Sequence, residues 1–395
     1  MIHYNFDEKG IVCIKMEVYL DNAATTRPYP QAADAVREAM LGNFGNPSSL
    51  HALGKRAEDA VTASRQTIAR SLGCDSAEVT FTSGGTEGNN LAIVGYCLAN
   101  RRRGNKIVTT AVEHPAVLEP LKWLESQGFA VELVRPQPSG AALAADVLSA
   151  VDGDTILVSC MAANNETGAI NPIADIAAGL DKKRTALHVD AVQAFGKLDC
   201  NVKRLGADLL TVSSHKIHGP NGVGALYARR GVKLSPIEYG GGQERGLRSG
   251  TENVAGIAGF ALAAEITLQN RERDMAHCTE LKRQLLEGLS QISCMTVNSP
   301  EDALPTVVNL SFPPVKAEVL LHVLESQGIF VSTGSACHSR NRGRSHVLTA
   351  MGLKNERIDS AIRISLSGEN TTEEMAYVVQ VLCKEVPILQ KVMGK

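Results

Sequence analysis

The sequence predicts an α/β protein with two parts: a large domain built on a mostly parallel sheet of seven strands, and a smaller α+β domain. Three observations support this fold class. Short apolar runs alternate with amphipathic segments between residues 78 and 228, as strands joined by helices do. After Asn253 one long helical run is followed by shorter strands and helices. The chain of 395 residues is also long enough for about two to three domains.

The large domain is expected to begin with helices over residues 30–41 and 48–72, the second capped by Ser48 or Ser49 and stopped by Gly73. The seven strands of the sheet are expected at 78–82, 106–111, 130–135, 155–160, 186–190, 209–213 and 224–228. Helices are expected between them at 86–103, 116–127 and 173–180.

The smaller domain is expected to contain the second half of a long helix. Its strands are predicted at 18–20, 307–311, 329–332 and 361–365, and its helices at 317–327 and from Thr371 onward. The long helical run covers 253–292, and we place the domain boundary inside it, near residue 270. The large domain then spans 26–270, and the smaller one combines 1–25 with 271–395. Residues 1–15 are weakly patterned, so either Met16 is the natural start or this lead-in adds a peripheral strand.

Composition excludes several classes of protein. The net charge of −2 gives no general reason to expect nucleic acid or a membrane surface as a partner. No apolar run approaches the roughly 20 residues of a membrane span. The nine cysteines are scattered without a CxxC pair, which argues against a disulfide framework or a metal site. We therefore expect a soluble, cytoplasmic protein.

Polar side chains follow the predicted strand 209–213. The strand breaks into Ser213, Ser214, His215 and Lys216, which would lie at the carboxyl edge of the sheet, where open α/β sheets bind ligands. We expect Lys216 to carry a cofactor as a Schiff base, with Ser213 and His215 holding the cofactor's phosphate. The alternative is a solvated lysine after a strand, which is the more common situation for a lone lysine.

Two further stretches suit the same cofactor. Gly84 and Gly85 precede a predicted helix at Thr86, and glycines followed by a helix start favour an anion. A plain capped turn is the alternative. Asp190 ends an apolar strand, where a carboxylate is costly to bury unless a cation such as a pyridinium nitrogen faces it. Gln193 could then reach the oxygen of the ring, although an aspartate such as Asp190, taken alone, is more often a helix N-cap.

His114 and Cys337 are candidate reactive groups. His114 leaves a strand end just before Pro115, and it could lie flat on a cofactor ring and transfer protons, although a single histidine is usually structural. Cys337 lies in a stretch rich in Ser, Gly and Arg, where exposure beside positive charges favours the nucleophilic thiolate. A solvated loop with an incidental cysteine is the alternative. Asn165 and the loop 240–253 are ambiguous alone.

Together these stretches closely resemble the class V, fold-type I pyridoxal phosphate enzymes, and among them the cysteine desulfurases of the NifS/IscS type. The resemblance runs in family order from about residue 19 to about residue 375. The matching segments are YLDNAATT, GNPSSLHALG, FTSGGTEGNN, TTAVEHPAVLE, HVDAVQAFGK, SSHKIHGPNGVGALY, GGGQERGLRSGTENV, GSAC and SHVLTAMGL.

The resemblance implies pyridoxal 5'-phosphate as the cofactor and a role for each candidate residue. Lys216 resembles the Schiff-base lysine, His114 the residue stacked on the ring, and Cys337 the nucleophile. Asp190 and Gln193 resemble the partners of the pyridine nitrogen and the ring hydroxyl. The implied phosphate ligands are Gly85, Thr86, Ser213, His215 and, from the second subunit of a homodimer, Thr251. The implied substrate-binding residues are Asn165 and Arg363, with Asn22 near the same site.

The implied reaction converts L-cysteine to L-alanine and leaves the sulfur as a persulfide on Cys337. An acceptor protein, either an iron–sulfur scaffold or a thiolation enzyme for tRNA or a cofactor, would then take the sulfur. Alternatives are a selenocysteine lyase, another aminotransferase or C–S lyase with the same cofactor, and a cofactor-free binding subunit. Gly88 stands where relatives commonly have serine, which predicts fewer phosphate contacts, and the segment 340–344 is unusually rich in arginine.

Overall fold

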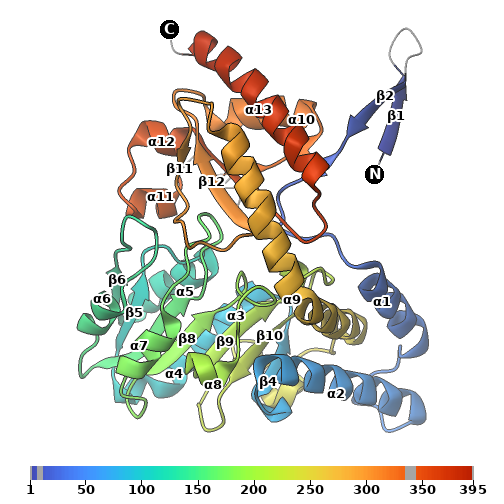
Figure 1. The fold of residues 1–395 in the computed structure, drawn as a ribbon. Helices are drawn as coiled ribbons and strands as arrows, with labels where there is room; N and C mark the ends of the chain where they lie inside the picture. The colour runs from blue at the N-terminus through green and yellow to red at the C-terminus, as the bar shows by residue number, and fades with distance from the viewer. Residues whose placement is uncertain (1, 7–11, 334–343, 394–395) are drawn as a thin grey trace.

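The computed structural model describes residues 2–6, 12–333 and 344–393, and it confirms the predicted α/β fold (Figure 1). A seven-stranded sheet has the order β4-β10-β9-β8-β7-β5-β6. Its strands are β4 (Val79–Thr82), β5 (Lys106–Thr110), β6 (Ala130–Val134), β7 (Thr155–Met161), β8 (Ala186–Asp190), β9 (Leu209–Ser213) and β10 (Gly224–Ala228). Strands β5 to β9 are parallel, whereas β10 is antiparallel to both of its neighbours.

Helices cover both faces of this sheet because successive strand residues point to opposite sides. Ile107 and Leu209 belong to the core under one face, while Val108 and Leu210 belong to the core under the other. The helices around the sheet are α1 (Pro30–Gly42), α2 (Ala52–Leu72), α3 (Gly85–Asn90), α4 (Tyr96–Asn100), α5 (Pro115–Ser126), α6 (Ala144–Ser149), α7 (Ile173–Gly179) and α8 (Val202–Leu205).

Three predictions about helices need correction. The helix expected over 86–103 is divided, because a π-helical stretch, Leu91–Gly95, separates α3 from α4. Helix α2 begins at Ala52 and not at Ser48, and His51 is its N-cap, with Nδ1 accepting a hydrogen bond from the backbone of Gly54. The sequence pattern missed α6 and α8, which are too short to show a helical periodicity.

A second, smaller sheet has the order β11-β12-β15-β14. Its strands are β11 (Thr296–Val297), β12 (Val307–Ser311), β14 (Ser332–Thr333) and β15 (Ala361–Ser365). Near the other end of the chain, β3 (Val18–Tyr19) pairs in parallel with β13 (Ile329–Phe330). The helices of this part are α10 (Ala317–Ser326), α11 (His346–Ala350), α12 (Asn355–Asp359) and α13 (Thr372–Met393).

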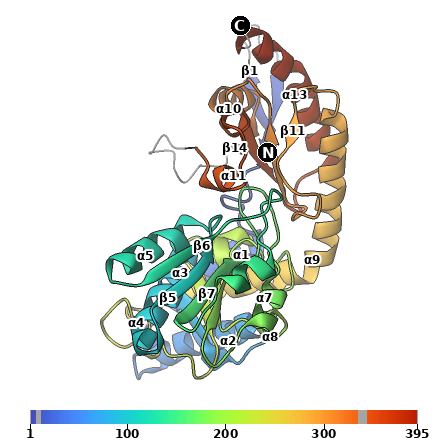
Figure 2. The same ribbon diagram turned by 90° about the vertical axis from the view of Figure 1, so that its left-hand side faces the viewer.

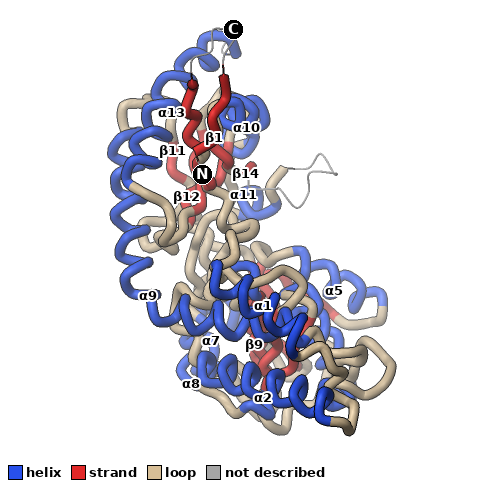
Figure 3. The backbone as a smooth tube through the Cα atoms, turned by 90° about the vertical axis from the view of Figure 1, so that its right-hand side faces the viewer, coloured by secondary structure: helices blue, strands red, loops and turns tan. Residues whose placement is uncertain are grey.

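Helix α9 (Val254–Leu289) connects the two parts of the molecule, as Figures 2 and 3 show. Ile257 and Phe260, near its start, pack in a core of the large sheet. Leu281 and Leu285, near its end, pack in the core of the small sheet. These two sets lie on either side of residue 270, and the domain limits expected near that residue stay a prediction.

The N-terminal segment forms β1 (Ile2–Phe6) and β2 (Val12–Met16), which pair antiparallel as a separate two-stranded sheet. This sheet stands apart from the rest of the chain in Figure 1. Among the described residues, none of the helices combines the length and the apolar character that a membrane span requires.

Candidate active site

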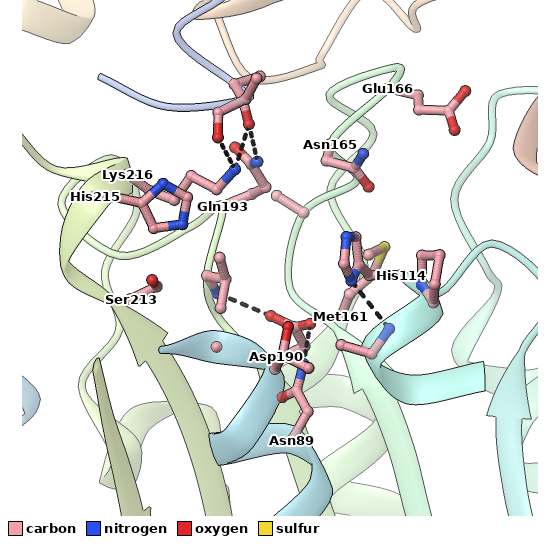
Figure 4. Close-up of a pocket in the computed structure, with 18 of the residues that line it drawn as sticks. Asn89, His114, Met161, Asn165, Glu166, Asp190, Gln193, Ser213, His215 and Lys216 are labelled. Carbon is pink, nitrogen blue, oxygen red and sulfur yellow. Dashed lines mark hydrogen bonds between the residues drawn. The ribbon is translucent and has the colours of Figure 1, made fainter. Parts of the chain in front are cut away.

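The carboxyl ends of the central strands open onto a cavity of about 280 Å³ (Figure 4). The chain reaches it from the ends of β5, β7, β8 and β9, from the segment after β3, and from β15. Most of the predicted site residues line this cavity: Gly85, Thr86, His114, Asn165, Asp190, Gln193, Ser213, His215, Lys216 and Arg363. In Figure 4, Lys216 and His215 lie on one side, His114 lies on the other, and Asp190 lies at the base.

Lys216 ends a short 3-10 turn that follows β9 directly. Its Nζ atom donates hydrogen bonds to the backbone carbonyls of Ala23 and Ala24, each at 2.6 Å. The same Ala23 carbonyl accepts a hydrogen bond from Gln193 Nε2 at 2.8 Å. The segment after β3 therefore holds both the amine and the amide at the wall of the cavity.

Asp190 is a buried carboxylate at the end of β8. Its Oδ2 atom accepts a hydrogen bond from Asn89 Nδ2 at 2.7 Å, and its Oδ1 atom accepts one from the backbone of Val192 at 3.0 Å. No helix begins after Asp190, so it is not the helix N-cap that we considered. Both of its hydrogen-bond partners are neutral, and burying a carboxylate is costly unless a cation lies beside it. The pyridinium of pyridoxal phosphate would supply that charge.

The opposite end of the cavity suits a phosphate group. Ser213 Oγ is fully buried there and has no hydrogen-bond partner among the described residues, which leaves an orphaned donor. Gly85 is required at its position, because a Cβ atom would lie 2.7 Å from a methyl carbon of Val192. Burial and the neighbouring Lys216 lower the pKa of His215 to about 4, so its imidazole is neutral at physiological pH. These residues fit the phosphate of the cofactor.

His114 is the N-cap of α5, and its Nδ1 atom accepts a hydrogen bond from the backbone of Ala116 at 3.1 Å. Because Nδ1 acts as an acceptor, the neutral ring carries its proton on Nε2. The ring therefore presents one N–H group that can exchange a proton.

Arg363 reaches the cavity from β15, in the smaller sheet. Its guanidinium donates to the backbone carbonyl of Asn165 at 2.9 Å and forms an ion pair with Asp21 at 2.7 Å. Its Nε atom is buried and has no partner among the described residues. A carboxylate in this cavity would find a fixed cation with an unused donor.

Two of the predicted site residues that the structure describes, Asn22 and Thr251, are not among the residues that line the cavity. The side chain of Asn22 donates a hydrogen bond to the carbonyl of Ser365 at 2.9 Å and fastens the N-terminal segment to β15. Thr251 lies in the exposed loop before α9, and its assignment to the site of a second subunit stays a prediction. Cys337 lies outside the described residues.

Several residues of the cavity wall were not predicted, among them Asn89, Met161, Glu166 and His346. Glu166 accepts a hydrogen bond from Ser345 Oγ at 2.5 Å, and burial raises its pKa to about 7. Asn89 was detectable in principle, because an asparagine inside a helix usually has a specific hydrogen-bond partner. His346 lies in the matched segment SHVLTAMGL, and Glu166 directly follows Asn165. Neither position in the sequence indicates that the side chain lines the cavity.

Gly88, where a serine was expected from relatives, has a packing explanation. A Cβ atom at this position would lie 2.6 Å from Cγ2 of Thr211 on β9. Glycine therefore allows α3 to approach the sheet closely at this point.

The sequence profile of the Aminotransferase class-V family matches residues 18–378. The "Cysteine desulfurase IscS" of Clostridium botulinum is 42% identical over 372 residues, which are 93% of this chain and 94% of the relative. The protein of the same name from Methanosarcina thermophila is 41% identical over 383 residues, 97% of this chain and 95% of the relative.

Solved structures agree with this relationship. A structure titled "NIFS-LIKE PROTEIN" superposes with a TM-score of 0.89 at 39% identity, covering 95% of this chain and all of the other. DndA from Streptomyces lividans superposes with a TM-score of 0.75 at 40% identity, covering 89% of this chain and 99% of the other. With its fold, its cavity and these similarities taken together, the chain belongs to the aminotransferase class-V family of pyridoxal phosphate-dependent, fold-type I enzymes.

Proposed function

We propose that this protein is a cysteine desulfurase, which converts L-cysteine to L-alanine and keeps the sulfur as a persulfide on Cys337. The observation that carries the proposal is the convergence of Lys216, Asp190, His114 and Arg363 on one cavity. Relatives at about 40% identity over most of the chain bear the name cysteine desulfurase, which supports the same activity here.

The proposed cofactor contacts are those that the family resemblance implies, and the donors and acceptors around the cavity support most of them. Lys216 would bind the aldehyde, Asp190 the pyridine nitrogen and Gln193 the ring hydroxyl, with His114 stacked on the ring. Gly85, Thr86, Ser213 and His215 would hold the phosphate, and Thr251 from a second copy of the chain would complete that site. When bound, the cofactor supplies an electron sink for negative charge at the substrate's Cα.

The protein's own groups would bind the substrate and move protons. Arg363 and Asn165 would hold the carboxylate of L-cysteine, since the guanidinium is already fixed by Asp21 and has an unused Nε donor. The Nζ atom of Lys216 would take the proton from Cα, and the Nε2–H group of His114 would donate a hydrogen bond to the substrate sulfur and exchange its proton there. The Cys337 thiolate would then form an S–S bond to the substrate sulfur as the Cβ–S bond breaks, and the carbon fragment would leave as alanine after protonation.

The partners of this reaction are also proposals. The enzyme would work as a homodimer, because Thr251 is exposed in its own subunit and would contact the site of the other. An acceptor protein for iron–sulfur cluster assembly or for thiolation of tRNA or a cofactor would take the sulfur. The cysteines whose side chains are described are free thiols, which supports a reducing, cytoplasmic compartment.

The test is to trap the persulfide. After L-cysteine is added to the purified enzyme, mass spectrometry of the peptide containing Cys337 should show a mass increase of one sulfur atom, together with stoichiometric alanine. Cys337→Ser should bind the substrate and change the visible spectrum without releasing alanine. Full alanine production by Cys337→Ser would rule out the desulfurase mechanism and favour a lyase that needs no protein thiol.

A further inference from the structure

The carboxylate of Glu87 connects two segments that are far apart in the sequence. Glu87 lies in the first turn of α3, and its side chain is only 9% exposed. Its Oε2 atom accepts a hydrogen bond from the backbone of Ser83 at 2.8 Å, and its Oε1 atom accepts one from Arg248 Nε at 2.9 Å. Each oxygen thus serves a different segment.

The Ser83 contact fixes the turn at the phosphate end of the cavity. The turn comprises residues 83–86, and its Gly85 and Thr86 line the cavity together with the unpartnered hydroxyl of Ser213. The backbone N–H of Ser83 lies beyond the end of β4, and the reach of Glu87 back to it resembles a capping interaction. This contact therefore holds the turn against the start of α3.

The Arg248 contact fixes the loop that carries Thr251. We call residues 240–253 the arm. A second buried carboxylate, that of Glu244, fastens the arm to α2 through two contacts of 2.7 Å with Arg65. The residues Glu244 and Arg245 have φ angles of 46° and 58°, which non-glycine residues rarely adopt and which the surrounding contacts must maintain. The arm is therefore held in a defined conformation.

We propose that Glu87 is a positioning residue that holds the phosphate-side turn and the arm in one fixed relation. This inference rests on the proposed function, because it assumes that Thr251 completes the phosphate site of a second subunit. In such a dimer each Glu87 would keep the turn of its own site in place and would also position the threonine delivered to the other site. Each of the two cofactor sites would then depend on the Glu87 carboxylates of both subunits.

The role of Glu87 can be separated from that of its neighbours with three variants of the cofactor-loaded protein. Glu87→Ala removes both contacts, whereas Arg248→Met removes the contact with the arm and leaves the contact with Ser83. Glu238→Gln is the matched control, since Glu238 faces the same guanidinium at 3.7 Å, is half-exposed and does not contact the turn. Glu87→Gln is a milder fourth variant, because its single amide oxygen can replace only one of the two acceptors.

Hydrogen exchange of the peptides covering 83–86 and 240–253 is the first measurement. Loss of a hydrogen bond to a charged group corresponds to roughly tenfold or greater destabilisation of a contact. In Glu87→Ala the backbone amides of both peptides should therefore exchange about tenfold faster than in the parent protein. In Arg248→Met only the amides of the arm should exchange faster, and in Glu238→Gln the exchange of both peptides should stay unchanged. The milder Glu87→Gln should exchange faster in one of the two. Unchanged exchange in the arm of Glu87→Ala, or faster exchange of the turn in Arg248→Met, would overturn the proposal.

Cofactor dissociation, followed by the loss of visible absorbance, is the second measurement. It should be faster in Glu87→Ala than in Arg248→Met, and the double variant should release the cofactor no faster than Glu87→Ala alone. If both segments exchanged faster in Glu87→Ala but the cofactor dissociated at the parent rate, Glu87 would have a structural role only, and the proposal would be overturned. Neither measurement uses L-cysteine, so a failure to form the persulfide would count against the proposed function and not against the role of Glu87.

Discussion

Asp190 illustrates how one residue combines structure and proposed chemistry. Its two oxygens are held by Asn89 and by the backbone of Val192, so the carboxylate cannot turn away from the cavity. A negative charge fixed in this way is available without reorganisation when a positive charge develops opposite it. The same carboxylate without a cation beside it would be an expensive group to bury.

The substitution Asp190→Asn keeps the size of the side chain and removes its charge. Because a preorganised charge is lost, alanine formation should fall on the order of 10²- to 10³-fold, and the visible spectrum of the bound cofactor should shift. Steady-state kinetics and absorbance measure the two effects. Asp208→Asn is the control, since Asp208 is equally buried but pairs with Arg229 at 2.7 Å, away from the cavity. A normal turnover in Asp190→Asn would contradict the role assigned to this residue.

Most residues of the site could be predicted from the sequence because several of them follow strand ends directly. The carboxyl ends of parallel strands meet at one edge of a sheet, so Asp190 and Ser213 had to lie near each other. Asn89 and Glu166 could not be predicted in the same way. Their positions depend on how a helix and a loop pack over that edge. An asparagine inside a helix indicates a hydrogen-bond partner without identifying it, and a glutamate in a loop indicates no particular contact.

Elements around the site are also linked by buried polar groups, and Glu113 connects the end of β5 to β7. Its Oε1 atom accepts hydrogen bonds from the Thr110 hydroxyl at 2.7 Å and from the backbone of Met161 at 2.8 Å. Burial is the main cause that raises its pKa to about 8, against 4.5 for the ordinary group. The folded protein therefore keeps Glu113 protonated at neutral pH, while the unfolded chain does not.

This difference predicts a pH dependence of stability. A raised pKa in the folded state favours the fold below the unfolded pKa, and that contribution is lost as the pH rises from 4.5 through 8. Glu113→Gln cannot ionise, so between pH 5 and pH 8 it should lose less stability than the parent, by on the order of 3 kcal/mol. Urea unfolding at pH 5, 7 and 9 measures the effect. If the free energy of unfolding changed with pH by the same amount in both proteins, the pKa of Glu113 would not be raised in the folded state.

The contact between α3 and β9 gives a prediction for a single glycine. In Gly88→Ser the new Cβ would meet Cγ2 of Thr211 at 2.6 Å, so α3 must shift and the protein should lose about 1–3 kcal/mol of stability. Thr211→Ser removes that methyl group and keeps the hydroxyl that contacts His188. The double variant should therefore recover most of the loss, as measured by urea unfolding. If the double variant lost as much stability as the two single variants together, the contact with Thr211 would not be the cause of the destabilisation.

At the scale of elements, the seven strands of the large sheet were predicted within one residue at each end because apolar runs bounded by turns define them clearly. The single strand expected at 329–332 was wrong, since β13 and β14 belong to different sheets, and β11 was not predicted. The helix expected over 86–103 was wrong as one regular element, since apolar periodicity does not distinguish a π-helical stretch from an α-helix. The cap of α2 was also wrong. Serine is the more usual N-cap, but the turn formed by Asn46 and Ser49 moves the helix start to Ala52.

The whole molecule brings together segments from opposite ends of the chain. Asp21 pairs with Arg363, and Asn22 donates to the carbonyl of Ser365. The family resemblance anticipated that these segments share a site, because residue patterns at both ends matched in order. It did not distinguish residues that touch the cavity from residues that fasten the segments together.

Asn22 and Asn165 should therefore respond differently to substitution. Asn22→Ala leaves the buried carbonyl of Ser365 with only the long 3.4 Å hydrogen bond from the backbone of residue 22, and it should cost about 1–3 kcal/mol of stability, with little change in the KM for L-cysteine. Asn165→Ala removes an amide that lines the cavity and should raise KM while the melting temperature changes little. Thermal melting and steady-state kinetics on the same preparations separate the two effects. A large KM effect of Asn22→Ala at unchanged stability would return this residue to the substrate site.

Helix α9 contributes its first turns to one core and its last turns to the other. A cut within this helix would also part the core of the small sheet from Val18 and Leu20, which belong to that core although they precede the helix in the chain, so the second fragment is not suited to independent expression. Because this one continuous helix belongs to both cores, we expect the two parts to unfold in a single transition on heating, which a calorimeter would record as one endotherm.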